Sequence, residues 1–76
     1  MVSITISIGS KSYDISLSEN LDLWHVFEVL KESGVLPDDF KCAYAKSQFE
    51  SREISIYKPL SEENIYSGDI VFVKEA

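Results

Sequence analysis

The sequence has little of several residue types. Its 76 residues include one cysteine, Cys42, and one histidine, His25. A single cysteine cannot close an internal disulfide or supply a cysteine metal cluster within the chain, which is typical of a reducing compartment. No apolar run approaches the ~20 residues of a membrane-spanning helix, and residues 1–8 lack the basic start of a signal peptide. We therefore expect a soluble cytoplasmic protein without membrane insertion, metal or cofactor.

Basic residues are also few. Seven lysines and arginines stand against thirteen acidic residues, which gives a net charge of −6. A phosphate backbone would be repelled by this charge, and no cluster of lysines and arginines offsets it locally, so nucleic acid is not an expected partner. The charge either favours basic protein surfaces or only maintains solubility.

The patterning at the start predicts a β-hairpin. Apolar and polar side chains alternate over residues 2–8 and again over 13–17, which is the period of half-buried strands. Residues 9–12, Gly-Ser-Lys-Ser, are typical of the loop between them. The N-terminal third of the chain should therefore have one apolar face.

The period then changes to that of a helix over residues 22–33. The apolar side chains fall at i, i+3, i+4 and i+7, namely Leu23, Val26, Phe27 and Leu30. Asp22 is placed to cap the first turn, and Gly34 and Pro37 are placed to end the helix. One face of this helix should be buried.

The remaining chain predicts shorter elements. Residues 40–45 alternate as a third strand, with Phe40, Cys42 and Tyr44 expected to face inward. Phe49 is expected to fill the core from a short strand, and residues 54–57 resemble another extended piece. Residues 60–65 are typical of one helical turn between two core residues, and 67–69 of a tight turn before an apolar strand over 70–73.

These elements together predict one α+β domain over residues 1–76. A hairpin and one helix cannot enclose a core alone, but a mixed sheet of four to five strands curled around the helix can. A last strand beside the first would lie in the middle of the sheet, which explains why residues 70–73 are apolar on both faces.

In order and spacing, these motifs resemble a ubiquitin-like β-grasp domain. The segments 32–38 (ESGVLPD), 42–45 (CAYA) with Gln48-Phe49, 60–65 (LSEENI) and 67–69 (SGD) are similar to ubiquitin's helix exit, third strand, short turn and final turn. Relative to ubiquitin, about five residues are inserted around 51–57. The resemblance implies a protein-binding domain without a catalytic site.

The sequence departs from ubiquitin at two places. It ends Val73-Lys74-Glu75-Ala76, without the diglycine that modifiers and sulfur carriers use, so conjugation or sulfur transfer would require a longer precursor. The alignment also places Ala43, Phe72 and Lys74 where ubiquitin has its aliphatic receptor-binding patch. Receptors of ubiquitin are therefore not expected to bind this surface.

Among ubiquitin-like proteins without diglycine, the chain is similar to the YukD/EsaB-like proteins of bacterial type VII secretion systems, in its length, its lack of a tail and its closing turn over 65–70. This resemblance implies a cytoplasmic accessory or regulatory component, an adaptor that binds a larger protein and is a monomer or weak oligomer. A small subunit of a multicomponent oxygenase is the alternative.

The candidate protein-binding residues surround the last strand. If Val71 and Val73 face the core, Ile70 and Phe72 point outward beside Ala43, with Lys41 and Lys74 as a basic rim. The opposite parity would put Phe72 in the core. Trp24 is expected at the edge of the buried helix stripe and completes the set of candidates.

Other chemically distinctive residues are interpreted as structural. His25 has no nucleophile at a suitable spacing, so no catalytic residue is proposed. Cys42 is expected to be a buried small apolar residue rather than a reactive thiol. The pairs Asp38-Asp39 and Glu62-Glu63 lack the spacing of a calcium loop and are expected to cap turns.

Overall fold

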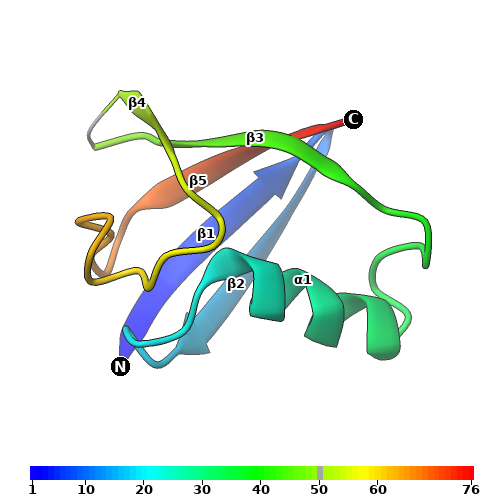
Figure 1. The fold of residues 1–76 in the computed structure, drawn as a ribbon, viewed down its shortest axis with the longest axis horizontal. Helices are drawn as coiled ribbons and strands as arrows, with labels where there is room; N and C mark the ends of the chain where they lie inside the picture. Colours follow the sequence, from blue (N-terminus) through cyan, green and yellow to red (C-terminus); the bar gives the residue numbers. More distant parts are fainter. Residues whose placement is uncertain (50) are drawn as a thin grey trace.

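In the part of the chain that the structure describes, five strands form one mixed sheet, and one helix packs against one of its faces (Figure 1). The computed structural model describes residues 1–49 and 51–76. The elements are β1 (Val2–Ile8), β2 (Lys11–Leu17), α1 (Leu23–Glu32), β3 (Cys42–Ser47), β4 (Arg52–Ile54) and β5 (Ile70–Glu75). Their order in the sheet is β2-β1-β5-β3-β4. The α+β class and the central position of the last strand are confirmed.

The hairpin forms as predicted but has a tighter turn. β1 and β2 pair antiparallel from Val2 opposite Leu17 to Ile8 opposite Lys11. Only Gly9 and Ser10 connect them, so Lys11 and the residue after it belong to β2 rather than to the predicted loop. Gly9 has a φ of +61°, a conformation that two-residue hairpin turns require and that glycine adopts without steric cost.

Both ends of α1 carry the predicted caps. The Asp22 carboxyl accepts the backbone N–H of His25 at 2.9 Å. After Ser33, Gly34 takes a φ of +81°, and the Val35 N–H bonds back to the Leu30 carbonyl, which closes the last turn. Since the buried side chains of α1 are Leu23, Val26 and Phe27, its apolar stripe lies on the sheet.

The core lies between α1 and the inner face of the sheet. β1 contributes four buried side chains at alternate positions, and β5 contributes Val71 and Val73. Leu60 and Ile65, each 1% exposed, seal the side of the core near the start of α1, where the Leu60 N–H bonds to the Leu21 carbonyl at 3.0 Å. The predicted turn between these two residues is confirmed, since the Ile65 N–H bonds to the Leu60 carbonyl.

The predicted parity of β3 is wrong after its first residue. A β-bulge between Cys42 and Tyr44 inserts one extra residue opposite β5. Side-chain alternation inverts across such a bulge. Ala45 and Ser47 are therefore buried, whereas Tyr44 is 40% exposed and points outward. Cys42, before the bulge, is partly buried as a neighbour of the core.

Phe49 is the second incorrect core prediction, because its side chain is 61% exposed. β3 ends at Ser47, which holds the last inward position of the strand. Beyond it, the Phe49 N–H bonds to the buried carboxyl of Asp69 at 3.3 Å. The ring lies on the surface near Gly68, where an added Cβ would be 3.9 Å from it.

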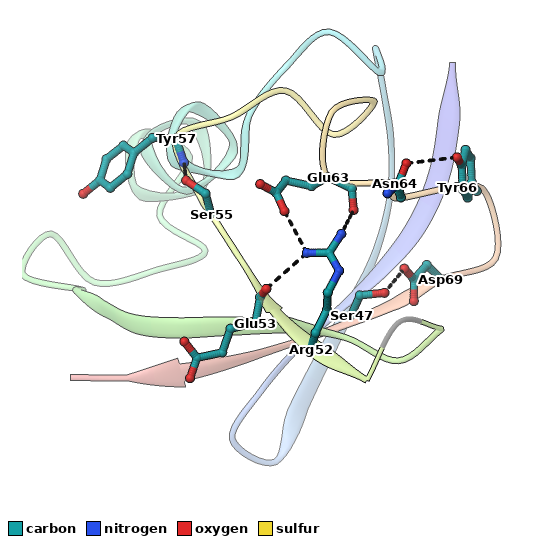
Figure 2. A network of polar contacts seen from close by, with 9 residues as sticks. All are labelled: Ser47, Arg52, Glu53, Ser55, Tyr57, Glu63, Asn64, Tyr66 and Asp69. Carbon is teal, nitrogen blue, oxygen red and sulfur yellow. Dashed lines mark hydrogen bonds and ion pairs between the residues drawn. The ribbon is translucent and has the colours of Figure 1, made fainter.

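Polar contacts fasten the segment between β4 and β5 to the sheet (Figure 2). The Arg52 guanidinium donates to the Glu63 carboxylate at 3.0 Å and to the Glu63 carbonyl at 2.8 Å. Deeper in the structure, Ser47 donates to the fully buried Asp69 at 2.5 Å. Asp69 directly precedes β5, so its contact with Ser47 fixes where β5 begins, whereas the Arg52 contacts hold the turn around Glu63 against β4.

Candidate functional site

The outer face of the sheet, which α1 does not cover, presents a continuous group of exposed side chains on β3 and β5. Phe72 is 45% exposed at the centre of β5. In the register of the sheet it lies opposite Ser7 of β1 and Lys46 of β3. Because Val71 and Val73 are buried, alternation places the Phe72 ring on the outer face. An aromatic ring is thus held on a rigid central strand.

Tyr44 and Lys46 extend this surface onto β3. Tyr44 lies opposite Lys74, and the Lys46 ammonium lies 5.5 Å from the centre of the Tyr44 ring, within cation–π range. Ile70 lies two residues before Phe72 on the same face and is partly buried. We name the five residues the outer-face patch: Tyr44, Lys46, Ile70, Phe72 and Lys74.

The structure places three of the six residues predicted from sequence in the outer-face patch and three outside it. Ile70, Phe72 and Lys74 share the outer face of β5. Ala43 is exposed at the bulge of β3 rather than beside Phe72, because the register sets Lys46 opposite that ring. Trp24 is 41% exposed on α1, on the other side of the sheet, and therefore cannot join the outer-face patch.

Trp24 and Lys41 come together at a separate place. They line a groove of about 260 Å³ with Phe27, Lys31, Phe40, Cys42, Ile56 and Tyr57. Its floor is formed by the edge-to-face pair of Phe27 and Phe40, whose ring centres are 5.4 Å apart. The predicted basic rim is thus not continuous, since Lys41 belongs to this groove and Lys74 to the outer-face patch.

Sequence reasoning missed Tyr44 and Lys46. Strict alternation from Phe40 places Tyr44 inside, and only the bulge reverses it. Lys46 had no assigned role in the predicted strand. The sequence offers one signal. Strict alternation from Phe40 would also turn Lys46 inward, and a lysine seldom faces a core. Weighing Lys46 above Tyr44 would have given the observed parity.

The charge of the outer-face patch contrasts with that of the whole chain. It carries two lysines, although the protein has a net charge of −6. Glu53 of β4 is opposite Lys46 and marks the border of the patch on that side. Aromatic side chains beside ammonium groups suit a partner surface that is apolar at its centre and acidic at its edge.

Two residues of types that are common in catalytic sites, His25 and Cys42, lie on α1 and β3. His25 Nδ1 lies 2.7 Å from the Asp22 carboxyl, on the exposed side of α1. Burial acts to raise the pKa of Asp22, but hydrogen bonds from the His25 backbone and ring outweigh it and hold this pKa below its ordinary value. Burial raises the pKa of the Cys42 thiol, which keeps it protonated at neutral pH.

The acidic pairs behave differently from one another. Asp38 and Asp39 are exposed, whereas Glu63 is buried against Arg52 rather than serving as a turn cap. Across residues 1–49 and 51–76, no three histidine, cysteine or acidic side chains are grouped to hold a metal ion. Over the same residues, no helix has the length and apolar character needed to cross a membrane.

Comparison with known proteins identifies the fold. No protein-family model and no curated protein matches the sequence. Among solved structures, the C-terminal ubiquitin-like domain of mouse tubulin-specific chaperone e is 17% identical, with a TM-score of 0.68 over 99% of this chain and 86% of that one. Caldiarchaeum subterraneum ubiquitin is 15% identical, with a TM-score of 0.67 over 99% and 92%.

A third similar structure is the EccD5 ubiquitin-like domain from Mycobacterium xenopi, 16% identical, with a TM-score of 0.58 over 99% of this chain and 93% of that one. At these identities the comparisons establish architecture, and their agreement over nearly the whole of each chain covers every element described above. The chain has the ubiquitin-like fold.

Proposed function

We propose that this protein is a non-catalytic ubiquitin-like interaction module that docks on a larger protein through the outer-face patch. The observation that carries the proposal is the position of Phe72, a 45% exposed ring on the central strand between two lysines. Aromatic side chains on rigid elements are typical centres of protein interfaces, because they lose little conformational entropy on binding. The similar solved structures are ubiquitin-like domains, which supports a binding role.

The finer proposal is that the larger protein belongs to a bacterial type VII secretion system, with this chain as a cytoplasmic accessory or regulatory component. The fold shared with the EccD5 ubiquitin-like domain is consistent with that setting. The patch would then bind an apolar surface with acidic margins. Its two lysines would increase the association rate at low salt.

Phe72→Asp tests the docking surface. Wild-type and variant proteins, immobilised in equal amounts, are used to capture partners from a lysate of the source organism. Loss of the wild-type partner is expected with Phe72→Asp, because an acid replaces the apolar centre of the contact. The same substitution at Val35, which is 43% exposed after α1, is the matched control and should retain the partner.

Folding of the variant separates a lost contact from a lost structure. Because Phe72 is exposed and Lys46 lies opposite it, Phe72→Asp should change the free energy of unfolding by about 1 kcal/mol or less. Retained capture by a folded Phe72→Asp protein would refute the surface. For the secretion role, deletion of the gene should reduce export of the system's substrates, and unchanged export would refute that part alone.

A further inference from the structure

The groove on the flank of α1 that faces β3 shares no described residue with the outer-face patch. It lies between α1, the start of β3 and the segment that follows β4, and it encloses about 260 Å³ (Figure 1). Four aromatic rings line it: Trp24, Phe27, Phe40 and Tyr57. We name this place the aromatic groove. Because aromatic side chains are enriched in protein interfaces relative to the rest of a surface, it is a second candidate for a contact site.

The floor and the rim of the aromatic groove differ in exposure. Phe27 and Phe40 are buried and belong to the core, whereas Trp24 is 41% and Tyr57 is 70% exposed. A ring as exposed as that of Tyr57 adds little to the core, and most of its apolar surface stays in water. The two rings at the rim therefore offer apolar area that a partner can bury.

Backbone hydrogen bonds hold the walls of the aromatic groove in place. The Trp24 N–H donates to the Ile56 carbonyl at 2.9 Å, which joins the start of α1 to the segment after β4. The Phe40 N–H donates to the Pro37 carbonyl at 3.0 Å and fixes the approach to β3. Since these bonds are internal to the protein, the groove is formed in advance and an occupant has little ordering to impose on it.

The charge at the aromatic groove is opposite to that of the whole protein. Lys31 and Lys41 line it, and none of the described residues that line it is acidic, although the chain has a net charge of −6. Lys31 bonds Glu28 at 3.3 Å, which offsets part of its charge. Among residues 1–49 and 51–76, Lys41 takes part in no ion pair. The Lys41 ammonium is therefore available to an anionic group of a partner.

Acidic residues elsewhere on the protein act weakly at this place. Glu75 is opposite Cys42 where β3 pairs with β5, but it does not line the groove. Exposed charges farther apart than about 8 Å are largely screened at physiological ionic strength. A ligand in the groove should therefore respond more to its two lysines than to the net charge of the chain.

The size of the aromatic groove favours a side chain over a free small molecule. Sites for small molecules and cofactors enclose about 300–1,000 Å³, and 260 Å³ is below this range. One large apolar side chain, presented by the backbone of another protein, is a better match for the space. Its neighbours in that protein would then lie over the rim, where the lysines select acidic residues.

We propose that the aromatic groove binds an acidic segment of another protein, which inserts one large apolar side chain between Trp24 and Tyr57. The inserted side chain rests on the two buried rings of the floor. Aspartate or glutamate residues on either side of it contact Lys31 and Lys41. This contact uses none of the outer-face patch and does not depend on the function proposed for that surface, so both places can be occupied at once.

An acidic peptide with a central leucine tests the site, because the groove contains two reporters of its own. Trp24 is the only tryptophan and Cys42 the only cysteine of the chain, and both line the groove. The probe has blocked ends, a leucine at its centre and glutamates on both sides. Titration should change the Trp24 fluorescence until it saturates. Saturating peptide should slow the reaction of Cys42 with a maleimide at least about fivefold, because it covers the thiol.

Two altered peptides separate the apolar side chain from the charge. Replacing the leucine by serine should weaken binding at least about tenfold, because the burial of an apolar side chain is lost. Replacing the glutamates by lysines should weaken binding at least about fivefold at low salt, and added NaCl should reduce that difference. The net charge of −6 alone would favour the lysine peptide, so this comparison isolates the local charge of the groove.

Two pairs of variants locate the contact on the protein. Lys41→Glu should weaken binding of the glutamate peptide at least about fivefold, whereas Lys11→Glu, the same change of charge on β2, should alter it less than about twofold. Tyr57→Ser should also weaken it at least about fivefold, whereas Tyr66→Ser, at an exposed tyrosine outside the groove, should not weaken it. Circular dichroism confirms that each variant is folded.

Three results would overturn the proposal. The first is the absence of both a saturable fluorescence change and protection of Cys42 at millimolar glutamate peptide. The second is binding of the lysine peptide that equals or exceeds binding of the glutamate peptide. The third is a dimer of the free protein, measured by sedimentation and dissociated by Tyr57→Ser, which would assign the groove to a second copy of the chain.

Discussion

Removing the buried carboxyl of Asp69 should destabilise the protein more than any surface change. This side chain is fully buried, accepts the Ser47 hydroxyl at 2.5 Å and accepts the Phe49 N–H at 3.3 Å. A hydrogen bond to a charged acceptor contributes about 1.5–3 kcal/mol, and the longer of these two belongs below that range. Asp69→Ala should therefore cost about 3 kcal/mol.

This loss is large for so small a domain, whose total stability is expected to be about 4–11 kcal/mol at ~0.05–0.15 kcal/mol per residue. It corresponds to a fall of roughly 12–24 °C in the melting temperature, measured by circular dichroism. Asp69→Asn retains an acceptor oxygen of similar shape and should lose about half as much. A cost below about 1 kcal/mol for Asp69→Ala, or equal costs for Asp69→Ala and Asp38→Ala at an exposed carboxyl, would refute this account.

Three further predictions concern single groups. Asp22→Ala should cost about 1 kcal/mol at pH 7 through loss of the helix cap. The folded protein lowers the pKa of Asp22, so the contribution of this carboxylate to stability is complete above the ordinary carboxyl pKa and falls as the pH drops through the pKa of the folded state. Urea unfolding should therefore show a smaller difference in the free energy of unfolding between wild type and Asp22→Ala at pH 3 than at pH 7. A larger difference at pH 3 would contradict the lowered pKa. Cys42 should react with iodoacetamide more slowly than free cysteine at pH 7.5, because burial raises its thiol pKa, and equal rates would show that the thiol is accessible. Gly34→Ala should destabilise by about 1 kcal/mol, because its φ of +81° disfavours a side chain; stabilisation in a melting curve would exclude that cause.

The periodic elements could be predicted from sequence because local and global requirements agree in them. The hairpin alternates strictly, and α1 has its cap, its apolar stripe and its terminating glycine where propensity places them. The central position of β5 also followed, since only an inner strand is apolar on both faces. A segment of seven or more residues is predictable when its propensity, its periodicity and its end signals all indicate the same element.

The errors occurred where one residue changes the register. The one sequence signal near Ala43 is Lys46, which indicates the parity but does not locate the bulge, so Tyr44 was placed inside and the aromatic part of the outer-face patch was underestimated. Phe49 seemed a core residue because it is large and apolar, but a long-range bond from its backbone to Asp69 holds it at the surface. Contacts between distant segments cannot be read from local pattern.

The parallel pairing of β1 with β5 has a consequence for synthesis of the protein. At ~5–20 residues per second, a ribosome makes this chain in about 4–15 s, and the strand that lies between β1 and β3 emerges late. Until it does, the apolar side chains of β1 and α1 have no complete site to pack into. The sheet should therefore be completed only after translation passes Glu75, and part of the apolar surface of β1 and α1 stays exposed until then.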